Sequence, residues 1–119
     1  MPHRDWKQRV EDILEALERI ESYTQGMTFD AFKSNSMAVD AVVRNLTVIG
    51  EAARHIPPEA QERYPHVPWA EMRAIRNILT HEYFGVSLPI LWETIARDLP
   101  PLSSMLKDLL TKESGPDRE

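Results

Sequence analysis

The segment DWKQRVEDILEALERIESY, residues 5–23, decides the fold class of this chain. Its apolar side chains recur every three or four residues, at Trp6, Val10, Ile13, Leu14, Leu17 and Ile20. An α-helix turns ~100° per residue, so it places such positions on a single face. The segment therefore predicts an amphipathic helix that buries one stripe against neighbouring helices.

The same periodicity continues through most of the chain. It predicts further helices at about 28–33, 36–55, 58–64, 68–83 and 87–112, the last interrupted by Pro100-Pro101. Thr28 and Ser87 are the expected N-caps of two of them, and Gly50 indicates close approach of another helix. No stretch alternates with period two, so no sheet is expected. We predict an all-α antiparallel bundle in which residues 1–113 form one domain and residues 114–119 a flexible tail.

Composition narrows the function classes. The chain has 119 residues and is 42% hydrophobic, which suits one domain with one core. The absence of cysteine excludes disulfides, thiolate nucleophiles and zinc sites built on cysteine. A net charge of −5 argues against broad, non-specific duplex binding. It still allows a small basic groove for RNA, for which the candidates are Arg44, Arg54, Arg73 and Arg76.

Location follows from what the sequence does not contain. No apolar run approaches the ~20 residues of a membrane span. The first residues, from Met1 to Asp5, lack an apolar segment of the signal-peptide type. The default expectation is therefore a cytoplasmic protein.

The stretch RNILTHEY, residues 76–83, carries the chemistry. Arg76 offers a permanent positive charge and a fork of donors shaped for phosphate. His81 can transfer a proton near neutral pH, and Tyr83 adds a hydroxyl that can bind or be modified. Together these side chains can bind a phosphodiester and cleave it without a metal ion.

Helical spacing constrains how these residues meet. Arg73, Arg76 and Tyr83 share one stripe, whereas Asn77 and His81 lie on an adjacent one. Arg76 and His81 are ~140° apart on an ideal helix. The end of the helix can fray and bring them together, or a second copy of the chain can complete the site. We favour the dimer, because one helix end supplies too few groups to surround a phosphate.

At these residues the chain resembles the HEPN superfamily, and within it the HepT toxins, whose signature is Arg-x4-His-x-Tyr. Two further segments resemble the same branch. They are VRNLTVIGEAA at residues 43–53, and Trp92-Glu93 followed by DLPPL at residues 98–102. The likeness covers roughly residues 5 to 113, and three segments in order are far more specific than Arg-x4-His alone.

The resemblance implies a HEPN-type helical bundle that forms a homodimer and cleaves RNA without a metal ion or another cofactor. It implies a partner, an MntA-like minimal nucleotidyltransferase that acts as antitoxin and transfers AMP to the motif tyrosine, here Tyr83. The implied catalytic residues are Arg76, which holds the phosphate, and His81, the general acid or base. Asn77, Tyr83 and Arg73 would support them by positioning RNA.

Some alternatives remain open from the sequence. The chain can instead be a non-catalytic helical binding module, or a substrate-binding subunit that docks a minimal nucleotidyltransferase, and its negative charge leans mildly that way. Glu51 is either a surface charge or a partner of a motif arginine. The leucines between 102 and 110 belong either to the core or to a dimer interface. His3, His55 and His66 are too scattered to predict a zinc site.

Overall fold

The computed structural model describes residues 5–81 and 87–114, with the side chains of residues 76–81 left outside that description. The helices are α1 (Trp6–Thr24), α2 (Phe29–Lys33), α3 (Ser36–Arg54), α4 (Pro58–Arg63), α5 (Trp69–His81), α6 (Leu88–Glu93), the π-helix η2 (Thr94–Asp98) and α7 (Leu99–Glu113). The described residues contain no strand. The predicted all-α, HEPN-like fold is confirmed, and the predicted boundaries are correct to within a residue or two where they can be compared.

Local sequence signals begin the helices. Asp5 caps α1, since its side chain accepts from the backbone N–H of Lys7 while the Gln8 side chain accepts from that of Asp5, both at 3.2 Å. Thr28 and Ser87 cap α2 and α6 as predicted. After α1 the chain turns at Gly26, whose φ of +77° is a conformation that glycine adopts without strain.

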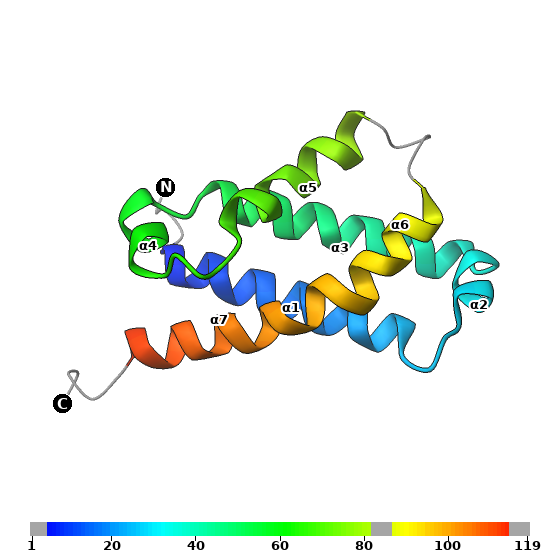
Figure 1. Ribbon diagram of the computed structural model, residues 1–119, viewed down its shortest axis with the longest axis horizontal. Helices are drawn as coiled ribbons and strands as arrows, with labels where there is room; N and C mark the ends of the chain where they lie inside the picture. Colours follow the sequence, from blue (N-terminus) through cyan, green and yellow to red (C-terminus); the bar gives the residue numbers. More distant parts are fainter. Residues whose placement is uncertain (1–4, 82–86, 115–119) are drawn as a thin grey trace.

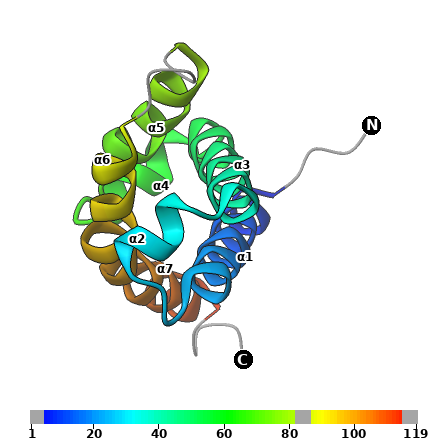
Figure 2. The same cartoon turned by 90° about the vertical axis from the view of Figure 1, so that its right-hand side faces the viewer.

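The long helix α3 lies between two others. It packs against α1 on one side and against α5 on the other, and α7 returns to lie against α1 (Figures 1 and 2). The α1 and α3 ribbons run antiparallel, with α2 at one end of the molecule and α4 at the other (Figure 1). Gly50 is buried in α3, in keeping with the close helix approach that its presence predicted.

The segment from α6 to α7 is one interrupted helix. Pro100 and Pro101 cannot donate backbone hydrogen bonds to the preceding turn, and their rings crowd its carbonyl groups. The chain widens there into the π-helix η2, in which the N–H of Leu99 donates to the carbonyl of Thr94, five residues back. The interruption was predicted, but it lies one turn before the prolines rather than at them.

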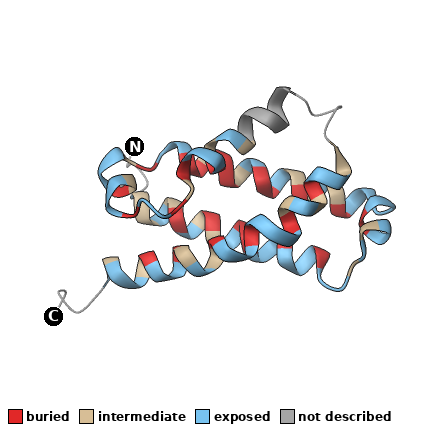
Figure 3. Ribbon diagram, viewed as in Figure 1, coloured by how far each residue is buried: buried red, intermediate tan, exposed pale blue. Residues whose placement is uncertain are grey.

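The core is a single cluster of buried apolar side chains, and buried and exposed positions alternate along the helices (Figure 3). Leu102, Leu106 and Leu109 of α7 belong to it, with at most 4% of their surface exposed. These three leucines are therefore core within one chain, whereas Leu110 is partly buried and packs against the same core. Among the described residues, no helix is both long and apolar enough to cross a membrane.

Candidate functional site

The helix that carries the candidate chemistry, α5, is fixed firmly at its first turn. Trp69 and Met72 are buried, with 5% and 1% of their surface exposed. The indole Nε1 of Trp69 donates to the backbone carbonyl of Tyr64 at 3.0 Å. A buried tryptophan whose N–H is also satisfied packs in one orientation, so the direction of α5 is set where the helix begins.

Arg73, one turn further along, connects α5 to α4. Its Nη1 donates to the side-chain oxygen of Gln61 at 2.9 Å. The amide nitrogen of Gln61 donates in turn to the backbone carbonyl of Ile56, also at 2.9 Å. The Arg73 side chain is half-buried, and it uses at least one donor to hold two elements together. The other guanidinium donors can still face a ligand.

A second polar cluster fixes the loop before α5 to the end of α7. The Tyr64 hydroxyl donates to Glu113 Oε2 at 2.5 Å, and Arg63 Nη1 donates to the same oxygen at 2.7 Å. Burial, followed by the hydrogen bond to Glu113, raises the pKa of Tyr64 to about 12. The hydrogen bonds from Tyr64 and Arg63 hold the pKa of Glu113 below its ordinary value. At neutral pH the tyrosine is therefore protonated and the glutamate charged.

The predicted catalytic residues lie at the other end of α5. The backbone is helical at Arg76, Asn77 and His81, which brings all three onto one helix. Their side chains, and Tyr83 as a whole, lie outside the described residues. Because the helix is regular through His81, the directions of Arg76 and His81 differ by ~140° about its axis. The predicted fraying near Glu82 lies outside the described residues.

The predicted basic groove is not assembled as expected by the side chains that the structure describes. Arg54 pairs with Glu51 at 3.1 Å, and Arg73 bonds to Gln61. Arg44 lies instead in a pocket between α1 and α3. Glu51 also meets His55 at 3.3 Å, so it is a paired charge on α3. Its relation to Arg76 falls outside the described side chains.

Sequence reasoning missed two features. One is Arg9, which lines the same pocket as Arg44. It stands among other polar residues of α1, and no periodic signal distinguishes it. The other is the contact of Tyr64 with Glu113, which joins residues 49 positions apart. Pairings of that range leave no local pattern in a sequence.

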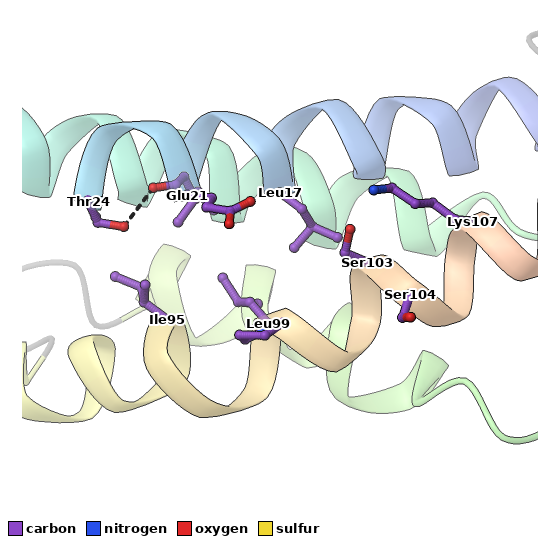
Figure 4. A pocket seen from close by; sticks show the side chains of 10 residues that line it. Leu17, Glu21, Thr24, Ile95, Leu99, Ser103, Ser104 and Lys107 are labelled. Carbon is purple, nitrogen blue, oxygen red and sulfur yellow. Dashed lines mark hydrogen bonds between the residues drawn. The ribbon is translucent and has the colours of Figure 1, made fainter. Parts of the chain in front are cut away.

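Another pocket, of about 390 Å³, lies between α1 and the η2–α7 segment (Figure 4). Its floor is apolar, and Glu21, Ser103 and Lys107 stand at its rim. None of the predicted site residues lines it. In the described part of the chain, no group of three or more histidine, aspartate or glutamate side chains is arranged to hold a metal ion.

Comparison with known proteins identifies the family. The model of the family described as "Ribonuclease HepT-like" matches residues 13–109. A protein of Thermococcus cleftensis named "Probable ribonuclease HepT" is 40% identical over 106 residues, which cover 89% of this chain and 96% of that protein. A protein of Methanocaldococcus jannaschii named as a "Putative RNase" is 38% identical over 117 residues, covering 98% of this chain and 97% of its own length.

One relative is larger. It is a Methanocaldococcus jannaschii protein named as a "Gamma-glutamylcyclotransferase and putative RNase", 39% identical over 107 residues; the match covers 90% of this chain but only 48% of that protein. No solved structure matches the chain significantly. The family match spans most of the helical bundle and includes every described residue of α5. The chain belongs to the HepT-like ribonuclease family.

Proposed function

We propose that this chain is the toxin of a HepT/MntA-type toxin–antitoxin pair, and that it cleaves RNA internally without a metal ion. The observation that carries the proposal is the arrangement of α5. Its start is fixed by Trp69 and Arg73, and its last turns carry Arg76, Asn77 and His81. A rigid helix can hold a catalytic constellation more accurately than a loop can. Membership of the HepT-like ribonuclease family supports the same reading.

The proposed reaction needs only groups on the RNA and on α5. The 2′-oxygen attacks the adjacent phosphorus while His81 takes its proton, and the bond from phosphorus to the 5′-oxygen breaks. The 5′-oxygen receives a proton, so the products are a 2′,3′-cyclic phosphate and a 5′-hydroxyl. Arg76 stabilises the charge that develops on the phosphate oxygens, and Asn77, Arg73 and Tyr83 position the strand.

The proposed active form is a homodimer. Because α5 is helical through His81, Arg76 and His81 of one chain diverge around the helix. A second α5 facing the first across a two-fold axis would bring Arg76 of one chain toward His81 of the other. Two helix ends would then surround one phosphate.

The proposed partner is an MntA-like nucleotidyltransferase that acts as antitoxin. It would transfer AMP from ATP to the hydroxyl of Tyr83, forming a bond from that oxygen to the α-phosphorus and releasing pyrophosphate. The modification adds negative charge and bulk seven residues after Arg76 and two after His81 in the sequence, which would block RNA by the same physics as phosphorylation.

Cleavage of RNA by the purified protein tests the catalytic proposal. We expect cleavage with EDTA present, products that end in a 2′,3′-cyclic phosphate, and a loss of rate of at least about a hundredfold in His81→Ala and in Arg76→Ala. His81→Ala with an unchanged rate would end the proposal. Ile90→Ala is the matched control, since Ile90 is 65% exposed and lies on α6, outside the motif.

Mixing the two inactive variants tests the dimer. If each site takes Arg76 from one chain and His81 from the other, half of the randomly mixed dimers are mixed and half of their sites are intact. About a quarter of the parental rate should return. If both residues act from one chain, mixing restores nothing.

Intact mass tests the antitoxin. Co-expression with the nucleotidyltransferase should add mass in steps of one AMP, and Tyr83→Phe should remove the addition. A parent protein that gains no mass and cleaves no RNA would favour the second candidate, a binding subunit that docks the nucleotidyltransferase. The observation that favours this second candidate is the net charge of −5, which is unusual for a protein that binds RNA.

A further inference from the structure

Two arginines for which the described residues provide no partner line a pocket of about 380 Å³ between α1 and α3. Arg9 of α1 and Arg44 of α3 both line it. Within the described ranges, neither side chain makes a hydrogen bond or an ion pair, and the Nε of Arg9 is fully buried. A buried donor without an acceptor costs free energy. The pocket that both side chains line can admit an acceptor from outside the chain to their other guanidinium nitrogens.

The two arginines are exceptions in this molecule. Every other arginine whose side chain the structure describes has a carboxylate or amide partner: Arg19, Arg54, Arg63, Arg73 and Arg97. Two guanidinium groups without a described partner in one pocket offer several N–H donors in two planar forks. The anion that matches this geometry best is a phosphate, which an arginine can bind with two parallel hydrogen bonds.

The pocket and the motif helix share α3. The helices α1 and α5 both pack against it, as the two views show (Figures 1 and 2). Axes of packed helices lie 8–10 Å apart, so the pocket lies within roughly 20 Å of the axis of α5. A strand of a few nucleotides bound at α5 can cross α3 and reach it.

Carboxylates in the same pocket decide which phosphate it suits. Asp12 and Glu51 also line it, although Glu51 is already paired with Arg54 and His55. Their negative charges oppose a free phosphate ion, which has no other contact to hold it. A phosphate of a strand already bound elsewhere arrives at high effective concentration and overcomes this repulsion.

We propose that Arg9 and Arg44 form a second phosphate-binding subsite, which holds the RNA backbone away from the bond that is cut. The inference rests on the proposed ribonuclease function and adds residues of α1 and α3 to it. The subsite would contribute affinity and length preference and would take no part in the bond-breaking step. It also explains how an acidic protein can bind RNA, because two arginines without a described partner line one pocket.

Binding and cleavage of matched RNAs test the subsite with Arg9→Gln, Arg44→Gln and the double variant. Binding is measured with 2′-O-methyl RNA, which cannot be cleaved through its 2′-oxygen, over a series of salt concentrations. Cleavage is measured on a dinucleotide too short to reach the pocket. Lys107→Gln is the control, because Lys107 is an exposed cation without a described partner in the pocket of Figure 4.

We expect the double variant to raise the Kd for the longer RNA about tenfold. The slope of log affinity against log salt should fall by roughly 0.7 for each phosphate contact that is lost. Dinucleotide cleavage should proceed at the parental rate, which also shows that the variants are folded. Lys107→Gln should leave both the Kd and the salt slope near the parental values.

Other outcomes overturn the subsite. If the double variant binds RNA as Lys107→Gln does while the parent cleaves RNA, the subsite is wrong and the ribonuclease function stands. If the double variant loses dinucleotide cleavage together with RNA affinity, Arg9 and Arg44 act at the candidate active site on α5 or in folding. Saturable binding of inorganic phosphate that is lost in the variants, with RNA affinity unchanged, identifies a free-phosphate site instead. A parent that neither binds nor cleaves RNA removes both proposals.

Discussion

The two ends of α5 differ in the residues that they carry. At the first end, Trp69 is buried, its indole is hydrogen-bonded to the loop before the helix, and that loop is bonded through Tyr64 to Glu113 of α7. The other end carries Arg76 and His81 and rises away from α3 (Figure 1). The buried contacts of α5 that the structure describes lie at its first end, and its candidate chemistry lies at the other. Substitutions at the first end should lower stability, and cleavage with it, whereas substitutions of Arg76 and His81 should lower cleavage alone.

The largest effect on stability is expected from Trp69→Ala. Removing a buried tryptophan lowers the free energy of unfolding by about 3–5 kcal/mol and frees the start of α5, so cleavage should fall as well. Urea unfolding monitored by circular dichroism measures the loss. Met37→Ala is the control, since Met37 is 81% exposed, and it should change stability by less than about 0.5 kcal/mol. If both variants unfold at the same urea concentration, Trp69 does not anchor the helix.

Tyr64→Phe should have a moderate effect. It removes the hydroxyl that donates to the charged Glu113, and a hydrogen bond to a charged group contributes about 1.5–3 kcal/mol. Because Arg63 still donates to the same carboxylate, we expect a loss near the lower limit. Tyr23→Phe is the matched control on the 41% exposed tyrosine of α1. Equal stability of the two variants would show that the Tyr64–Glu113 contact contributes nothing.

The same contact predicts how stability depends on pH. The pKa of Glu113 is lowered by folding, so its contribution is fully present above the ordinary value of 4.5 and is lost as the pH falls through the lowered pKa. The pKa of Tyr64 is raised, so its contribution is fully present below pH 10 and is lost as the pH rises toward about 12.

Urea unfolding of the parent and of Glu113→Gln at a series of pH values measures these two dependences. The parent should lose stability relative to Glu113→Gln in acid, below about pH 4.5, and also above pH 10, because Glu113 contributes to the raised pKa of Tyr64. In Tyr64→Phe, the decrease in the free energy of unfolding above pH 10 should be smaller than in the parent. If the stability of all three proteins depended on pH in the same way, the Tyr64–Glu113 contact would not be the cause of the two pKa shifts.

The smallest effect is expected from Arg19→Gln. Arg19 pairs with Glu15 at 3.0 Å on the outside of α1, and both side chains are more than half exposed. Exposed pairs of this spacing contribute about 0.3–0.5 kcal/mol, and salt screens them. Unfolding with and without added salt should show a difference no larger than that. If Arg19→Gln lost as much stability as Tyr64→Phe, the exposed Arg19–Glu15 pair would contribute as much as the less exposed Tyr64–Glu113 contact.

Much of the fold could be predicted because its signals are local. The stripe of residues 5–23, the caps at Thr28 and Ser87 and the prolines at 100 and 101 act on neighbouring residues, and each prediction was correct or nearly so. The predicted interruption lies one turn before the prolines, as a π-helix that the sequence did not predict.

The site was less predictable, because side chains from separate helices choose their partners in space. Arg54 and Arg73 were expected in a groove with Arg44, yet nearer partners, Glu51 and Gln61, engage them. Arg9 joins Arg44 only because α1 and α3 are packed side by side. The roles of Arg76, Asn77, His81 and Tyr83 stay predictions, which the cleavage and mass experiments test.

The 49-residue separation of Tyr64 and Glu113 has a consequence for the kinetics of folding. Helices α1, α3 and α5 meet through shorter loops, and contacts that close shorter loops form at a smaller loss of chain entropy. We expect the end of α7 to dock late, after the rate-limiting step. Interactions absent from the transition state slow unfolding and leave the folding rate nearly unchanged. Tyr64 and Glu113 would then set how long the native protein persists, while the speed of its formation depends on the three helices that precede them.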